Sequence, residues 1–204
     1  MADKPFAEYA ARNAAPVLEV LRREFRDCAE VLEIGSGTGQ HAVTFAAELP
    51  HLQWQTSDLD ENLPGIHAWI ESAQLANLRA PLALDVRTAR LDAAAVDAVF
   101  SANTAHIMGI DAVEAMFSLV GEVLRGGGVF CLYGPFRTGG AFNTDSNAQF
   151  DLSLRSRDPQ MGIRDLETLD EFGARAGLTR ERLYAVPSNN YIATWERRAI
   201  DDLA

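Results

Sequence analysis

Short apolar runs alternate along the chain with longer segments in which apolar residues recur at helical spacing. Such an alternation is typical of parallel strands joined by helical crossovers, and it predicts a doubly wound α/β fold. The strand-like runs lie at residues 31–34, 53–57, 81–84, 96–101, 129–133, 183–186 and 191–195. Helical periodicity predicts helices at residues 14–26, 40–49, 63–76, 112–124 and 169–176. A turn-like Pro-Ser-Asn-Asn joins the last two runs, so an antiparallel hairpin is expected there.

Two of the predicted helices carry side chains suited to capping their N-termini. Asp111 precedes one helix with Glu114 three residues later, and Thr168 precedes the other with Glu171 in the same place. In a capping box, the first side chain bonds an amide of the first turn and the acid reaches back to the cap. Asp111 and Thr168 are therefore predicted to be the N-caps of these helices.

Residues 134–164 interrupt the alternation. Gly, Pro, Asn, Ser and Arg dominate there without strand or helix periodicity, and so long a segment is usually either functional or disordered. The segment also contains the apolar side chains Phe136, Phe142, Phe150 and Leu152. These side chains favour a packed excursion over a flexible linker.

Composition narrows the class of protein. A chain of 204 residues with 48% hydrophobic residues suits one well-packed domain. No apolar stretch approaches the ~18 residues of a membrane span, and the first residues lack a secretory signal, so a cytoplasmic protein without a membrane partner is expected. The formal net charge of -11 disfavours nucleic acid as a partner. Cys28 and Cys131 are too few for a disulfide framework.

A glycine-rich loop, Gly-Ser-Gly-Thr-Gly at residues 35–39, follows the first predicted strand, where doubly wound folds place a ligand crevice. Its spacing differs from the G-x-G-x-x-G of dinucleotide-binding loops, which bind a pyrophosphate. Glu33 lies two residues ahead of the first glycine. A carboxylate at the mouth of the loop would repel a pyrophosphate and would suit a cationic ligand. The α-ammonium and sulfonium groups of S-adenosylmethionine are cations of this kind.

An acid followed by G-x-G-x-G between a strand and its helix resembles the first motif of the class I S-adenosylmethionine-dependent methyltransferases. The order and spacing of later acids match that family over residues 30–134. The resemblance implies S-adenosylmethionine as the cofactor and a single Rossmann-like domain. It also implies a mostly parallel seven-stranded sheet with a C-terminal antiparallel hairpin and helices on both faces.

The resemblance carries over to residues near the strand ends. It implies that Asp58 accepts hydrogen bonds from the ribose hydroxyls and that Asp85 accepts one from the adenine amino group. Asp58 can instead be a turn-former or helix cap, with Asp60 and Glu61 as rivals for its role, and Asp85 can be an ordinary turn acid. The residues implied for the cofactor are Asn13, Glu33, Gly35, Ser36, Gly37, Gly39, Asp58, Leu59, Asp85, Val86, Ser101 and Asn103.

A narrower resemblance extends over nearly the whole chain. Its elements are Arg12-Asn13, Ser57-Asp58, Tyr133 to Phe136, Ser146-Asn147, Phe150-Asp151 and Gly162 to Asp165. Together they look like a small methyltransferase-like family, of the type of methyltransferase-like protein twenty-six, classed as a domain of unknown function. The resemblance implies that Arg12 and Asn13 help to cover the cofactor; the alternative is a helix cap and a solvated arginine. The expected parts are an N-terminal helical cover at residues 1–29, a cofactor-binding core at 30–134, a substrate lid at 135–165 and a helix with a hairpin at 166–204.

Methyl transfer from a sulfonium is an in-line displacement with a good leaving group, so positioning supplies much of the rate. A general base is needed only if the acceptor must lose a proton. The topology places Asn103, His106 and Tyr133 near the methyl group, and these are the candidate catalytic residues. His106 can act as a base, or it can pack under the cofactor or cap the following helix. The other histidines have no spacing suited to a metal ion, and no metal site is predicted.

Four arginines concentrate in the expected lid of an otherwise acidic chain, and guanidinium groups bind carboxylates in bidentate fashion. Asn147, Arg155 and Arg157 are the candidate substrate-binding residues, for a small acceptor that is expected to be anionic. Aspartates in the same segment allow an alternative in which the arginines form internal ion pairs.

The sequence thus predicts S-adenosylmethionine-dependent methyl transfer to a small-molecule substrate by a monomer or homodimer. Two alternatives stay open. One is a protein-directed methyltransferase, and the other is a non-enzymatic protein that binds S-adenosylmethionine or a partner on the same fold.

Overall fold

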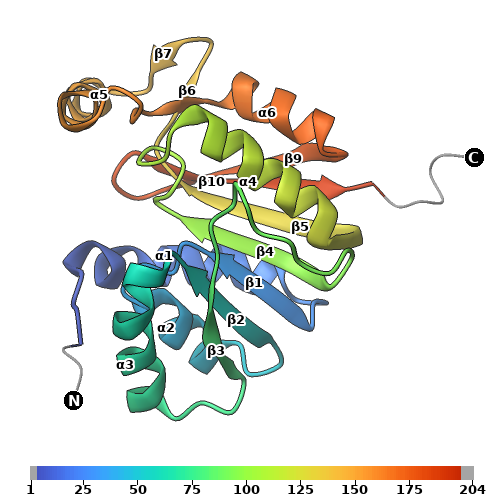
Figure 1. Cartoon of the computed structure of the whole chain (residues 1–204). Helices are drawn as coiled ribbons and strands as arrows, with labels where there is room; N and C mark the ends of the chain where they lie inside the picture. Colours follow the sequence, from blue (N-terminus) through green and yellow to red (C-terminus); the bar gives the residue numbers. More distant parts are fainter. Residues whose placement is uncertain (1–3, 199–204) are drawn as a thin grey trace, which may run out of the picture.

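A seven-stranded sheet forms the centre of the computed structural model, which describes residues 4–198. The strands are β1 (Glu30–Ile34), β2 (Gln53–Asp58), β3 (Leu78–Ala83), β4 (Val96–Ala102), β5 (Leu124–Gly134), β9 (Leu178–Val186) and β10 (Asn190–Arg197). Their order across the sheet is β3-β2-β1-β4-β5-β10-β9 (Figure 1). Neighbouring strands from β3 to β5 are parallel, whereas β10 lies antiparallel to both β5 and β9. This confirms the predicted mostly parallel sheet with a C-terminal antiparallel hairpin.

Helices cover both faces of the sheet (Figure 1). One face carries α1 (Glu8–Glu24), α2 (Gln40–Glu48) and α3 (Leu63–Ala73), and the other carries α4 (Ile110–Val123) and α6 (Leu166–Arg175). Each face has its own cluster of buried apolar side chains, one around Trp54 and Phe100, the other around Phe117 and Trp195. Val99 and Phe100, neighbours in β4, belong to different clusters and are both fully buried, as expected in a central parallel strand. No helix that the structure describes has the length and apolar character of a membrane span.

Both predicted N-caps are wrong. α4 begins one residue before Asp111 and α6 begins two residues before Thr168, and neither helix has a side-chain hydrogen bond at its N-cap. α6 follows directly on a short strand that pairs with a neighbouring segment. Just before α4, the carbonyl of His106 likewise accepts a hydrogen bond from the distant amide of Gly162. Tertiary contacts therefore fix where these helices begin, and the local capping pattern does not.

Several elements begin earlier than the apolar pattern predicts, among them β5, which starts at Leu124 and not at residue 129. α1 starts at Glu8, ahead of the predicted residue 14, and carries Pro16 within it. β3 starts at Leu78 and β9 at Leu178, ahead of the predicted residues 81 and 183. β3 and β9 form the two edges of the sheet, where many side chains are exposed and the apolar pattern is weak.

Residues 134–165 form an ordered excursion, as their apolar side chains predict. It contains a small sheet of β6 (Phe136–Thr138), β7 (Ala141–Phe142) and β8 (Arg164–Asp165), and the helix α5 (Asp145–Arg157). Figure 1 shows α5 and β7 at the end of the molecule away from α3. The sequence analysis missed α5. Its buried residues are Asn147, Asp151 and Leu154, two of them polar, so it has no apolar stripe that periodicity can detect.

Candidate functional site

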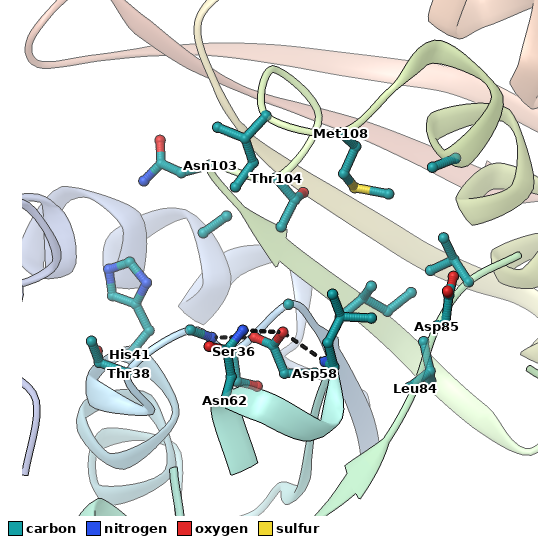
Figure 2. A pocket seen from close by; sticks show the side chains of 18 of the residues that line it. Ser36, Thr38, His41, Asp58, Asn62, Leu84, Asp85, Asn103, Thr104 and Met108 are labelled. Atoms are coloured by element: carbon teal, nitrogen blue, oxygen red, sulfur yellow. Dashed lines mark hydrogen bonds between the residues drawn. The ribbon is translucent and has the colours of Figure 1, made fainter. Parts of the chain in front are cut away.

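A cavity of about 400 Å³ lies at the carboxyl ends of β1, β2, β3 and β4. This is the edge at which doubly wound sheets bind their ligands. Its lining comes from the glycine loop, the chain that follows β2, the chain that follows β3, and residues 102–104 and 107–109 at the end of β4 and after it. Tyr9 and Ala10 of α1 line it as well. Figure 2 shows Asn103, Thr104 and Met108 facing Ser36 and Asp58 across the cavity, with the other labelled side chains around it.

The glycine loop is held against β2 by main-chain hydrogen bonds. The amides of Gly35 and Ser36 both donate to the carbonyl of Ser57, at 3.0 Å. Gly35 has φ +74°, and a Cβ there would lie 2.5 Å from Cγ2 of Thr104. Gly37 has φ +58°, and a Cβ there would meet nothing within 4 Å. Only glycine adopts these conformations readily, and at Gly37 the main chain borders open space.

Asp58 lies at the cavity and also shapes the loop. One carboxylate oxygen accepts a hydrogen bond from the amide of Gly37 at 2.7 Å, and the other accepts from the Leu59 amide and the Asn62 side chain, both at 2.8 Å. Leu59 also lines the cavity, whereas the exposed Asp60 and Glu61 do not. Asp58 is therefore a turn-former, which was the alternative considered for it, and it also lines the cavity.

Glu33 does not lie at the mouth of the loop, where the sequence analysis expected it. It is 1% exposed and lies beneath the loop, outside the cavity lining. One of its oxygens accepts hydrogen bonds from Oγ of Ser36 at 2.9 Å and from Nε1 of Trp54 at 3.1 Å. Burial raises the pKa of Glu33 to about 7, although these two hydrogen bonds oppose the shift. The side chain points from β1 into the core, so it supports the loop from below.

Asp85 follows the end of β3, and both Asp85 and Val86 line the cavity. The Asp85 carboxylate accepts from Nε and Nη2 of Arg87, at 3.0 and 2.6 Å, and from the Arg87 amide at 3.0 Å. These hydrogen bonds lower the pKa of Asp85. Asp85 is thus a turn acid that also faces the cavity.

Of the remaining residues expected to bind the cofactor, some line the cavity and others lie behind its lining. Asn103 lines it with φ +60°. Ser101 is fully buried and donates to the Ile34 carbonyl at 2.7 Å, and Gly39 is the N-cap of α2. Asn13 lies behind the lining and accepts a hydrogen bond at 2.6 Å from Nε2 of His41. His41 does line the cavity, and burial lowers its pKa to about 4.

Of the three candidate catalytic residues, only Asn103 lines the cavity. Tyr133 is 3% exposed, and its hydroxyl accepts from Nδ2 of Asn190 at 2.9 Å. His106 points toward α5, where its ring packs edge-on against Phe150 at 5.4 Å. Burial, followed by the positive charge of nearby arginines, lowers the pKa of His106 to about 4. The ends of β4 and β5 do converge as expected, but these two side chains turn away from the cavity.

None of the candidate substrate-binding residues lines the cavity. Asn147 donates to Oδ1 of Asn143 at 2.7 Å. Arg155 pairs with Asp151 at 2.7 Å and borders a second, more open depression of about 460 Å³, while Arg157 is exposed. Within the part of the chain that the structure describes, residues 135–165 contribute nothing to the cavity lining. An internal ion pair, the alternative considered for the arginines, is present at Arg155.

The sequence analysis missed several lining residues because no motif marks them. Tyr9 and Ala10 precede the predicted start of the first helix, and Thr104, Ile107 and Met108 lie in an irregular segment. For Thr104, Ile107 and Met108, the available signal was their position directly after β4, at the same sheet edge as the glycine loop.

The sheet order and the cavity beside the glycine loop define the Rossmann-like fold of the class I methyltransferases. An O-methyltransferase family protein from Burkholderia thailandensis has this fold, with 15% identity and a TM-score of 0.80 over 95% of this chain and 58% of that one. An O-methyltransferase family 2 protein from Planctomyces limnophilus, in complex with apigenin, has 16% identity and a TM-score of 0.80 over 93% and 58%. Human N-acetylserotonin methyltransferase, in complex with S-adenosylmethionine, has 12% identity and a TM-score of 0.79 over 94% and 53%.

The chain belongs to the family described as protein of unknown function DUF938, which matches residues 4–197. It spans somewhat more than half the length of the solved structures named above, covering 53% to 58% of each. At this level of identity, the likeness to those structures shows the fold alone. The narrower likeness to methyltransferase-like protein twenty-six stays a prediction.

Proposed function

We propose that this protein binds S-adenosylmethionine in the cavity and transfers its methyl group to a small-molecule acceptor. The observation that carries the proposal is the cavity itself, about 400 Å³ in volume and formed by the glycine loop, Asp58 and Asp85 at the ends of successive parallel strands. Pockets for small ligands and cofactors usually measure about 300–1,000 Å³.

The lining residues fit this cofactor. The open space at Gly37 lets the main chain approach the methionine end of a ligand closely. Asp58 already accepts three hydrogen bonds from the chain, which leaves about one acceptor position for a ribose hydroxyl. Asp85 lies at a separate point of the cavity, suited to the adenine amino group (Figure 2). Val86 and Leu59 would supply apolar contacts to the base.

The bound cofactor would supply an electrophilic methyl group on a sulfonium. The chain would bind the cofactor and the acceptor, orient them and exclude water. Positioning of this kind accounts for much of the acceleration of a displacement. His41 is neutral at physiological pH because burial lowers its pKa to about 4, so it adds no like charge beside a cationic ligand. Asn103, at the end of β4, is the candidate catalytic residue that the cavity retains.

A small molecule is the acceptor that the solved neighbours favour. One of them is an N-acetylserotonin methyltransferase, and another is in complex with apigenin. The arginines of the excursion lie outside the cavity, so we do not extend the proposal to an anionic acceptor.

The experiment that tests the proposal follows a labelled methyl group from S-adenosylmethionine into a panel of small phenols, carboxylates and amines. We expect one of these classes to be methylated, with equimolar release of S-adenosylhomocysteine. Labelling only of proteins in a cell extract would instead favour the protein-directed alternative. Cofactor binding without transfer to any acceptor would favour the non-enzymatic one.

A further inference from the structure

One wall of the cavity, residues 103–109, belongs to no helix or strand. Its side chains Thr104, Ile107 and Met108 line the cavity. Inside the segment, the amides of Ile107 and Met108 both donate to the Thr104 carbonyl, at 2.9 and 3.1 Å. These two bonds make a single turn, and further carbonyls of the segment bond to a distant part of the chain.

The partner of those carbonyls is Arg164 in β8. Its Nε donates to the Ala105 carbonyl at 2.9 Å, and its Nη2 donates to the Met108 carbonyl. Beside it, the amide of Gly162 donates to the His106 carbonyl at 2.9 Å. Three of the four carbonyls from residue 105 to residue 108 are therefore bound by residues 162–164.

Arg164 is an unusual arginine because it is 8% exposed. Among the described residues, no carboxylate lies within ion-pair distance of its guanidinium group, whereas Arg155, from the same excursion, pairs with Asp151. Burial of a charge is costly unless the N–H groups are hydrogen-bonded, and here they bond main-chain carbonyls, including that of Gln160 at 2.7 Å. The arrangement fixes main-chain positions and does not neutralise a charge.

The position of the wall matters because it packs against the glycine loop. Oγ1 of Thr104 bonds Oγ of Ser101 at 2.7 Å, and Cγ2 of Thr104 lies in the space that a Cβ of Gly35 would need. A shift of the wall therefore changes the shape of the cavity where the loop borders it.

We propose that Arg164 is a positioning residue of the cofactor cavity, which holds the main chain of residues 105–108 so that Thr104, Ile107 and Met108 stay in the wall. This rests on the proposed function, since a ligand of that cavity measures the effect. Without Arg164, the wall is in place in only a fraction of the molecules, and the apparent affinity for a ligand falls to that fraction of its intrinsic value.

The experiment compares Arg164→Met with Arg164→Lys and with Arg180→Met as the matched control. Arg180 is also partly buried and makes a bidentate pair with Asp170 of α6, at 2.8 and 2.9 Å, but it lies on β9 and outside the cavity lining. By calorimetry, we expect Arg164→Met to raise the Kd for S-adenosylhomocysteine about tenfold, the effect of losing hydrogen bonds from a charged group. Arg164→Lys should restore part of the affinity, and Arg180→Met should leave the Kd unchanged.

A second measurement needs no ligand. Hydrogen exchange of the Ile107 and Met108 amides should be faster in Arg164→Met and unchanged in Arg180→Met. If Arg164→Met does not fold, Gly162→Ala replaces it. A Cβ there would lie 2.9 Å from Oδ1 of the buried Asp151, and Gly162 has φ +151°, so alanine strains the backbone that donates to the His106 carbonyl.

An unchanged Kd in Arg164→Met, or an equal rise in Arg180→Met, would overturn the proposal. Unchanged exchange at Ile107 and Met108 would do the same. If the wild-type protein binds no S-adenosylhomocysteine, the proposed function fails, and the exchange measurement still decides the role of Arg164.

Discussion

The glycine-loop side of the cavity and the wall at residues 103–109 are held in place by different means. On the loop side, the partners are neighbours in the sheet: the Ser57 carbonyl binds two loop amides, and Asp58 binds the amide of Gly37. On the wall side, the main chain is bound by Arg164, which lies 56 and 59 residues beyond its two partners in the segment.

Because of this difference, the two sides of the cavity should respond differently to substitution. The loop depends on a few residues that border it directly, so substitutions there should lower both the stability of the fold and the affinity for the ligand. The wall depends on the excursion after β5, so a distant residue should change affinity without touching the ligand.

The largest effect is expected at the contact between the two sides, from Gly35→Ala. The substitution places a Cβ 2.5 Å from Cγ2 of Thr104 and forces alanine to φ +74°. Strain of this backbone conformation and overpacking together should lower the free energy of unfolding by about 4 kcal/mol. Gly37→Ala is the control, with φ +58° but no neighbour within 4 Å, and should lose about 1 kcal/mol. Equal losses in urea denaturation would contradict the close packing of loop and wall.

The next largest effect on stability is expected from Glu33→Gln, which changes the side chain that supports the loop from below. Burial raises the pKa of Glu33 from 4.5 to about 7, so the folded state binds a proton more tightly than the unfolded state. The contribution of Glu33 to stability is therefore complete below pH 4.5 and is lost as the pH rises to about 7. Its size is about 3 kcal/mol. Gln keeps the acceptor for Ser36 and Trp54 without ionising.

The Glu33→Gln variant should therefore gain stability relative to wild type between pH 5 and pH 8. Denaturation curves at several pH values measure this difference, with the exposed Glu61→Gln as control. A difference that does not change with pH would show that Glu33 titrates normally.

A smaller effect, on ligand affinity, is expected from Asp58→Ala. The variant loses the acceptor for the Gly37 amide and the proposed ribose contact, so affinity for S-adenosylhomocysteine should fall by about 2 kcal/mol. Asp60→Ala, next to the cavity but outside its lining, should bind as wild type does. If Asp60→Ala weakens binding and Asp58→Ala does not, the role belongs to the other acid.

The smallest effect is expected at Arg155, which lies on the excursion and outside the cavity lining. Its side chain is 42% exposed, and its pair with Asp151 has i,i+4 spacing. The Asp151 side chain is 8% exposed but keeps its hydrogen bond from the Ile163 amide at 2.7 Å, so loss of the arginine should cost about 1 kcal/mol. Arg155→Ala should thus change the melting temperature little and the affinity for S-adenosylhomocysteine not at all. A raised KM for an identified acceptor in this variant would restore the substrate role predicted from the sequence.

The sequence predicted the glycine-loop side well because its signals are local. The parallel strands, the loop at residues 35–39 and the position of Asp58 and Asp85 beside strand ends follow from apolar runs and from the family resemblance of the loop. Glu33 was misplaced because the motif gives its position in the chain but not the direction of its side chain, which burial in the core decides.

The wall and the excursion could not be predicted in the same way. α5 buries polar side chains such as Asn147 and Asp151, so it lacks an apolar stripe. From the sequence, Arg164 was identified only as one of four arginines of the expected lid and as part of the Gly162 to Asp165 element, because its partners are main-chain carbonyls that carry no sequence signal. Contacts between distant segments also moved the starts of α4 and α6 away from their predicted caps.

The most direct test of the account is a calorimetric titration of the wild-type protein with S-adenosylhomocysteine, repeated with S-adenosylmethionine and with NAD. The cavity, with Asp58 and Asp85 at two points of its lining, predicts one site per chain and a Kd of about 1–100 μM for the first two compounds. NAD should not bind, because the loop lacks the spacing of a pyrophosphate site. Binding of NAD, with no heat from either S-adenosyl compound, would contradict the central claim.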